Sequence, residues 1–351
     1  MNERILALGM IVTGAALTAC SGSDSDLQTA ANEGGTQAAL TYPNGEPMPM
    51  TPWGDPDLRG TWPIQHLIGT PFQRPEEYGT RETYTDEEFA AREEQLNETR
   101  NARYEEEIKK NKMGMGHWAE TTDAQRINSL LVDPPNGRFP ELTEKGKELA
   151  KEMGSSWSRD KFDSPADFDT WDRCITRGLP PSMFPFNYNN GIKIHQAPGY
   201  VVIQLEMIHE ARIIPVDGRP PLSPKVKQWM GESRGHWEGP TLVIETTNFN
   251  GKTGQTNVGI PGSPQGNTPA TTNMKLTERL TRVSDNQIDY SMTVEDPEVL
   301  THSWTARYPM YLDNSYGFFE YACHEDNTAV RNFIETSRYE RAKAAEEASK
   351  Q

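Results

Sequence analysis

The C-terminal half of the chain alternates between apolar and polar residues with a period of two. From residue 187 to about residue 322 the alternation is interrupted by turn pairs, among them Pro198-Gly199, Asp217-Gly218 and Asp285-Asn286. Alternation of this kind predicts half-buried strands, and short turns join antiparallel neighbours. The predicted strands are 190–196, 199–208, 210–216, 236–247, 274–284, 287–295, 300–309 and 316–322.

About eight strands joined mostly by short turns indicate a mainly β protein. We expect residues 187–327 to form an antiparallel meander that closes as a barrel or a strongly curved sheet. The long connection at 248–273 is an exception, because loops of this length are often lids or binding loops. Either an ordered lid or a disordered insertion fits its sequence.

Residues 51–186 are expected to form an N-terminal arm and helices that pack on this core. The arm is rich in Pro, Gly and Trp. Thr85 and Glu88 form a capping-box pattern for a highly charged helix that runs to about Lys112. A second helix follows Thr143, and residues 328–351 form a charged C-terminal helix. Such helices lie on the surface, because their apolar stripes are thin.

The N-terminal pattern is that of an exported protein. Glu3 and Arg4 precede an apolar run from Ile5 to Leu17, too short to span a bilayer and typical of a secretory signal. The end of this run, Leu-Thr-Ala-Cys, resembles the lipobox of bacterial lipoproteins. The resemblance implies that residues 1–19 are removed and that Cys20 carries lipid, which anchors without spanning the membrane.

Residues 20–50 are expected to be a flexible tether, because they hold few large apolar side chains. The expected location is the cell envelope of a Gram-negative bacterium. Ser21 takes the place where Asp resembles an inner-membrane retention signal, so the outer membrane is favoured. Which face of that membrane is not indicated.

Composition and charge limit the classes of molecule that this protein is expected to bind. The formal net charge is −16 at pH 7, and an acidic chain repels phosphate backbones, which argues against nucleic acid. The remaining partners are a small-molecule ligand and the membrane, through the lipid on Cys20. Cys174 and Cys323 are expected to form one disulfide in an oxidising compartment, with two free thiols as the alternative. The oligomeric state is open.

Two stretches resemble known catalytic motifs, but neither has the surrounding sequence that its motif requires. Gly231–Gly235 matches G-x-S-x-G, but a helix-like stretch precedes it and a strand follows, the reverse of the hydrolase order. His209-Glu210 begins H-E-x-x-H, but Ile213 occupies the second His position. We therefore expect no cofactor and no metal.

Several polar residues share faces with apolar ones in the predicted strands. A carboxylate on an apolar face is costly unless it is paired or hydrated, so such residues indicate a polar pocket in an apolar wall. The candidate ligand-binding residues are His195, Gln204, Glu206, Glu245 and Glu278. The alternative is structural ion pairs, Glu206 with Arg212 and Glu278 with Arg279 or Arg282.

Glu206, His209 and Arg212 are the candidate catalytic residues. They cluster at the end of an apolar strand, so we expect them to converge at one mouth of the sheet, beside the 248–273 loop. There Arg212 would hold a carboxylate ionised, and His209 would titrate near neutral pH.

Four stretches resemble a large family of uncharacterised secreted bacterial proteins. They are VDPPNGRFPELT, PGYVVIQLEMIHEARIIPVDGRP, WMGESRGHWEGPTLVIETTNFN and ERLTRV. The resemblance covers most of residues 51–327. It implies secretion and one β-rich domain but no chemistry, and no functional residue carries over.

The sequence thus predicts a lipid-anchored envelope protein that binds a small, largely apolar ligand in a β-sheet pocket. A first alternative is a small-molecule hydrolase or lyase that uses Glu206 or His209 as a general acid or base. A second is an envelope scaffold or interaction protein, with helices 85–112 and 328–350 as partner surfaces. Whether the protein is an enzyme is open.

The anchor is directly testable. Cys20→Ala should move the protein from membrane to soluble fractions, because it removes the only side chain that the lipobox pattern assigns to acylation. Cell fractionation and immunoblotting measure the distribution, with Ser21→Ala as a matched control. An unchanged distribution of the Cys20 variant would show that the anchor is not this lipid.

Overall fold

A computed structural model describes residues 40–120, 123–152, 160–255 and 268–350, except the side chains of residues 115, 118, 152 and 209. The expected signal peptide, Cys20 and residues 21–39 of the expected tether lie outside the described residues. Residues 40–50 were also assigned to the tether, but here they pack on the domain. Tyr42 and Met48 are buried, and the Tyr42 hydroxyl donates to Asp285 at 2.9 Å.

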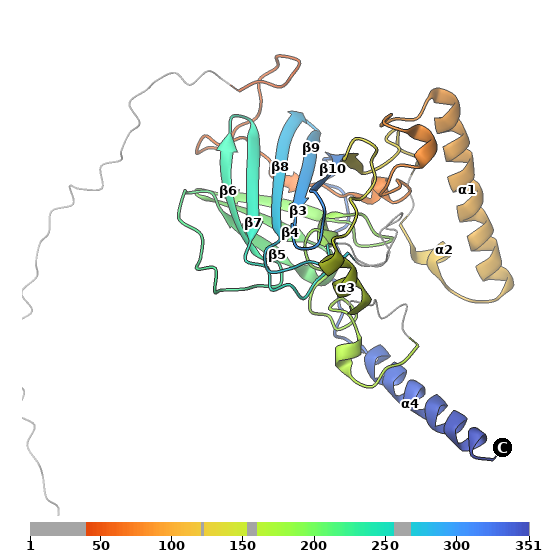
Figure 1. The fold of residues 1–351 in the computed structure, drawn as a ribbon. Helices are drawn as coiled ribbons and strands as arrows, with labels where there is room; N and C mark the ends of the chain where they lie inside the picture. Colours follow the sequence, from red (N-terminus) through yellow and green to blue (C-terminus); the bar gives the residue numbers. More distant parts are fainter. Residues whose placement is uncertain (1–39, 121–122, 153–159, 256–267, 351) are drawn as a thin grey trace, which may run out of the picture. The chain divides into compact units, whose positions relative to one another are not determined.

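The described strands form two antiparallel sheets (Figure 1). The four-stranded sheet has the order β1-β3-β4-β5, with β1 at Gly60–Thr61, β3 at Ile192–Ala197, β4 at Tyr200–Leu205 and β5 at Ala211–Pro215. The six-stranded sheet has the order β2-β10-β9-β8-β7-β6. Its strands are β2 Leu131–Asp133, β6 Glu232–Glu238, β7 Thr241–Thr247, β8 Lys275–Ser284, β9 Gln287–Glu295 and β10 Trp304–Tyr311.

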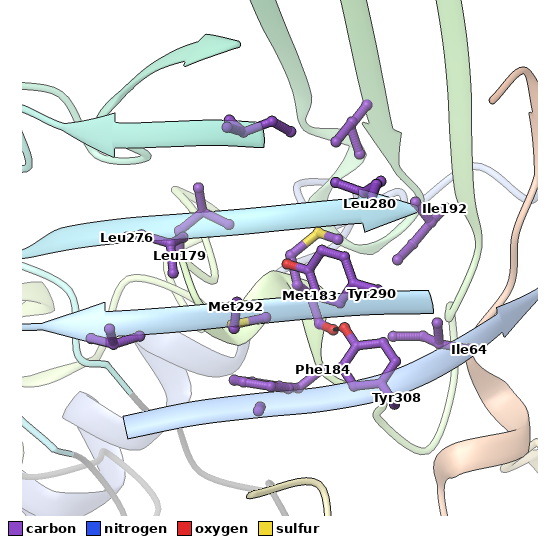
Figure 2. Packing of buried hydrophobic residues seen from close by; sticks show 14 of the residues in the cluster. Ile64, Leu179, Met183, Phe184, Ile192, Leu276, Leu280, Tyr290, Met292 and Tyr308 are labelled. Atoms are coloured by element: carbon purple, nitrogen blue, oxygen red, sulfur yellow. Dashed lines mark hydrogen bonds between the residues drawn. The ribbon is translucent and has the colours of Figure 1, made fainter. Parts of the chain in front are cut away.

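The mainly β fold with antiparallel neighbours is confirmed, but the described strands do not close into a barrel. β5 and β6 are each an edge of their own sheet. The 216–231 connection between them is long enough for the chain to leave one sheet and enter the other. The strands of the two sheets run across one another (Figures 1 and 2).

Three strand predictions change. The predicted strand 236–247 is not one strand. It covers the end of β6, a turn at Gly239 and Pro240, and all of β7, which pairs with β6 as a hairpin. Gly239 has φ +58°, a left-handed value that suits glycine. The predicted strand 316–322 is irregular. β1 and β2 come from the N-terminal arm, where no strand was expected at Gly60–Thr61.

The predicted helices are present. α1 spans Asp86–Lys109 and has the expected capping box between Thr85 and Glu88. The other elements are short or terminal. The α-helices are α2 Met115–Trp118, α3 Glu144–Glu152 and α4 Ala329–Ala348, and the 3₁₀ turns are η1 Gln65–Leu67, η2 Glu76–Tyr78, η4 Pro165–Asp167, η5 Pro181–Met183 and η6 Met207–His209.

The space between the sheets is filled by one hydrophobic cluster (Figure 2). Ile192 of β3 and Leu280 of β8 both belong to this cluster, and Tyr290 packs on Tyr308 with ring centroids 5.0 Å apart. Trp304 is a fully buried member of the same cluster. The sheet interior is therefore a packed core in which large side chains leave little room for a ligand.

One ion pair crosses this core. Arg212 of β5 donates from Nη1 to Glu278 Oε1 of β8 at 2.9 Å, and its Nη2 also bonds the carboxylate. Both side chains are almost fully buried, at 3% and 0% exposure. Tyr290 donates to the same carboxylate at 2.7 Å, and Ser233 accepts from Arg212 at 3.2 Å.

These contacts identify the partners that the sequence left open. Glu278 pairs with Arg212, and not with Arg279 or Arg282. Arg279 bonds Glu238 at the surface, and Arg282 donates to backbone carbonyls. Burial alone lowers the pKa of Arg212, but the adjacent Glu278 more than offsets this, so the pKa lies above its ordinary value.

Breaking this ion pair should make the folded protein less stable. Glu278→Gln leaves a buried guanidinium without its counter-charge, so the free energy of unfolding should fall by about 3–5 kcal/mol. The matched control is Glu245→Gln, which breaks the exposed pair with Lys275 and should cost under about 1 kcal/mol. Urea titration followed by tryptophan fluorescence measures both. Equal losses in the two variants would contradict the bridging role of Glu278.

Candidate functional site

The best candidate site is a cleft of about 810 Å³ outside both sheets. Its walls come from three irregular or terminal segments, residues 162–172, 188–189 and 320–333. Aromatic side chains dominate the lining, with a few polar groups among them. The aromatic members are Phe162, Phe168, Trp171, Tyr188, Tyr321 and Phe333, and the polar ones are Asp172, Asn189, Glu320 and Asn327.

Ring contacts and one hydrogen bond order the inner wall of the cleft. Trp171 is buried edge-on against Phe186, with centroids 4.7 Å apart. Its indole Nε1 donates to the Tyr321 hydroxyl at 3.1 Å. The rings of Tyr188 and Tyr321 are nearly parallel, with centroids 6.4 Å apart. Burial and the neighbouring Tyr321 raise the pKa of Tyr188 well above its usual range.

The predicted disulfide is confirmed and forms part of this wall. Cys174 and Cys323 are bonded, with Cα atoms 5.7 Å apart. Cys323 lines the cleft, and Cys174 lies three residues after Trp171. The bond therefore joins two of the three segments that form the cleft.

Glu206 supports the same wall from behind. Its carboxylate is 1% exposed and accepts hydrogen bonds from Asn189 Nδ2 at 3.0 Å and from the Gly191 amide at 2.8 Å. It also accepts from the Tyr316 hydroxyl at 2.9 Å and the Phe319 amide at 2.8 Å. These bonds attach the irregular segment after β10 to the turn before β3, just ahead of Glu320 and Tyr321.

The fit around this carboxylate is close. A Cβ at Gly191 would lie 2.6 Å from Glu206 Oε2, so the backbone amide approaches the carboxylate only because no side chain intervenes. Tyr316 also lies 3.2 Å from Glu120, which makes its hydroxyl a link between two carboxylates. Burial and these two carboxylates raise the pKa of Tyr316 well above its usual range.

The expected convergence of Glu206 and Arg212 is not found. Glu206 bonds the 189–191 turn and the 316–319 segment, whereas Arg212 points into the core and bonds Glu278. Neither shares a bonding partner with the other. The side chain of His209 and residues 256–267 of the long loop lie outside the described part of the structure.

The five candidate ligand-binding residues are not brought together either. His195 and Gln204 meet on the outer face of the four-stranded sheet, with Nε2 and Oε1 3.3 Å apart. Glu245 is exposed and pairs with Lys275, whereas Glu278 is in the core. The alternation located the strands. The polar residues that it singled out, however, lie on different faces of two crossed sheets, so they do not line one cavity.

The sequence patterns did not single out Arg177 as a candidate site residue. It is 3% exposed and lies behind Trp171 and Phe186, with its guanidinium carbon 5.5 Å and 5.3 Å from their ring centroids. Burial lowers its pKa to about 10. Its segment has no periodic pattern, so nothing in the sequence separates it from an ordinary surface arginine.

A second cavity of about 630 Å³ lies beside Glu210, Arg212 and Glu232, between the edges of β5 and β6. Its carboxylates have partners: Glu210 accepts from Thr176 at 2.7 Å, and Glu232 pairs with Arg234. Of its arginines, Arg212 and Arg234 each leave only Nε without a partner among the described residues. The aromatic cleft remains the stronger candidate, because it is larger and is lined mainly by aromatic rings.

Comparison of the chain with protein-family models, curated proteins and solved structures gave no match. Within the described residues, no group of three or more His, Cys, Asp or Glu side chains is placed to hold a metal ion. None of the helices in that part of the chain is long and apolar enough to cross a membrane. The site must therefore be interpreted from its own geometry.

Glu206→Gln tests whether this residue is structural. Whichever way the amide turns, its NH₂ group meets two donors that the carboxylate accepted, so the free energy of unfolding should fall by about 2–4 kcal/mol. His195→Gln, on an exposed face, should have little effect. Wild-type stability in the Glu206 variant, measured by urea unfolding, would contradict the structural role and return Glu206 to the candidates for acid–base chemistry.

Proposed function

We propose that the protein is a lipid-anchored envelope protein that binds a small, largely apolar ligand in the aromatic cleft. The cleft itself is the observation that carries this proposal. Ligand sites are commonly concave, of about 300–1,000 Å³, and lined by apolar and aromatic groups with a few polar ones. The cleft of about 810 Å³ fits that description in size and lining.

This proposal moves the site away from the sheets. The sequence placed the ligand in a β-sheet pocket, but the interior between the sheets holds a packed hydrophobic cluster. The cleft lies where three irregular segments meet, which is where backbone can adapt to a ligand without breaking a strand pairing. A ligand there would contact ring faces and the polar groups of Asp172, Asn189 and Asn327.

The anchoring part of the proposal rests on Cys20 and its lipobox pattern, with the outer membrane favoured. A lipid-anchored binding domain would stay close to a membrane from which apolar molecules leave slowly. The tether would end by about residue 40, because Tyr42 and Met48 are buried.

The enzyme alternative lacks support from Glu206. A general acid or base must reach a substrate proton, but both oxygens of this carboxylate are occupied by internal donors. The scaffold alternative would use α1, none of whose residues is buried. No contact in the described residues favours either function over ligand binding.

The cleft can be tested with the fluorescent apolar probe N-phenyl-1-naphthylamine. We expect the full-length chain carrying Cys20→Ala to bind the probe, and Phe333→Ala to weaken binding roughly tenfold because it removes a ring from the cleft wall. The matched control is Phe319→Ala, since Phe319 is 70% exposed and outside the cleft lining. Equal affinity of the two variants, or no binding by the parent, would contradict the proposal.

A further inference from the structure

Arg177 is a buried charge whose hydrogen bonding is incomplete. Its Nη1 donates to the Phe184 carbonyl at 3.0 Å, but Nε and Nη2 are buried and have no hydrogen-bond partner among the described residues. Buried charges are normally paired or fully hydrogen-bonded, because desolvation is costly. The two aromatic rings beside Arg177 offset only part of that cost.

The two unpartnered nitrogens form one edge of the guanidinium. Nε–H and one Nη2–H point in parallel, which is the geometry that binds both oxygens of a carboxylate. Other arginines of this chain use that edge in this way. Arg59 donates from Nε and Nη2 to Asp57 at 2.9 and 2.7 Å, and Arg307 donates to Asp289 at 3.1 and 2.8 Å.

The guanidinium lies directly behind the inner wall of the aromatic cleft. Trp171, one of its stacking partners, lines the cleft. The Tyr188 and Tyr321 hydroxyls, also in the lining, are close enough to offset part of the fall that burial causes in the pKa of Arg177. The two tyrosine side chains are hydrogen-bonded to each other, so an acceptor that enters the cleft must displace this contact to reach Arg177.

Two carboxylates in the lining oppose an anion, Asp172 and Glu320. Glu320 is exposed, so water screens its charge. At the Tyr188 hydroxyl, Arg177 acts more strongly than Asp172, because its effect on the pKa of Tyr188 is the larger of the two. Arg177 therefore offsets the negative charge of Asp172 at the Tyr188 hydroxyl.

We propose that the ligand of the cleft is an apolar carboxylic acid, such as an aryl or acyl carboxylate, and that Arg177 binds its carboxylate. The apolar body would occupy the aromatic cleft, and the carboxylate would separate the Tyr188 and Tyr321 hydroxyls to reach Nε and Nη2. This inference rests on the proposed ligand-binding function and adds the chemical class of the ligand.

Three probes with one aromatic body test the charge preference. The probes are 2-naphthylacetate, its methyl ester and (2-naphthylmethyl)trimethylammonium, titrated calorimetrically into the full-length chain carrying Cys20→Ala. We expect the carboxylate to bind roughly ten- to hundredfold more tightly than the ester, the range for hydrogen bonds to a charged group, and the ammonium to bind most weakly.

Two variants assign the preference to a residue. Arg177→Met removes the charge and keeps the length, so the carboxylate should fall to the affinity of the ester while the ester is unchanged. Asp172→Asn is the control of opposite sign and should raise carboxylate affinity a few-fold. If Arg177→Met does not fold, Arg177→Lys keeps a charge without the parallel donors and should lose most of the preference.

The outcomes separate this inference from the function on which it rests. Equal binding of carboxylate and ester, or tighter binding of the ammonium, would overturn the carboxylate assignment and leave apolar ligand binding intact. A preference that persists in Arg177→Met would overturn the role of Arg177. If none of these probes and no N-phenyl-1-naphthylamine binds, the proposed function itself fails.

Discussion

The free-energy cost of burying charged side chains constrains this structure more than any single helix or strand does. Arg212 and Glu278 lie in the space where the two sheets cross, and each is tolerable there only because the other is present. Tyr290 and Ser233 supply further hydrogen bonds to the pair. The pair requires β5 to face β8, so it fixes how one sheet lies on the other. The largely apolar contacts in the rest of the core are not directional and do not fix this position.

Glu206 meets the same constraint without a cation. Four hydrogen-bond donors surround its carboxylate, two of them backbone amides. This arrangement needs a residue without a side chain at position 191, which is Gly191. The gain is that an irregular segment with no strand pairing is held in place beside Trp171, and the Cys174–Cys323 bond secures it a few residues later. A cleft built from loops thereby obtains a defined wall.

How much of this follows from sequence depends on periodicity. Alternation located most of the sheet, and the Thr85–Glu88 pattern located α1, because both signals are local. The hairpin at Gly239 was missed, since the alternation continues on both sides of a two-residue turn. The partner of Arg212 could not be chosen, because pairing across crossed sheets depends on their relative placement. The cleft was missed because most of its lining comes from irregular segments without a period, and nothing in the sequence brings them against the start of α4.

Arg177 completes the comparison of buried charges. Arg212 has Glu278, and Glu206 has four donors, but Arg177 has one carbonyl and two ring faces. Two of its nitrogens have no partner among the described residues, whereas Arg212 and Arg234 each leave only Nε without one. A buried charge so poorly satisfied is costly for the protein alone. The unsatisfied edge lies behind the cleft that is suited to an apolar molecule. The two features account for each other if the molecule that fills the cleft brings the missing acceptor.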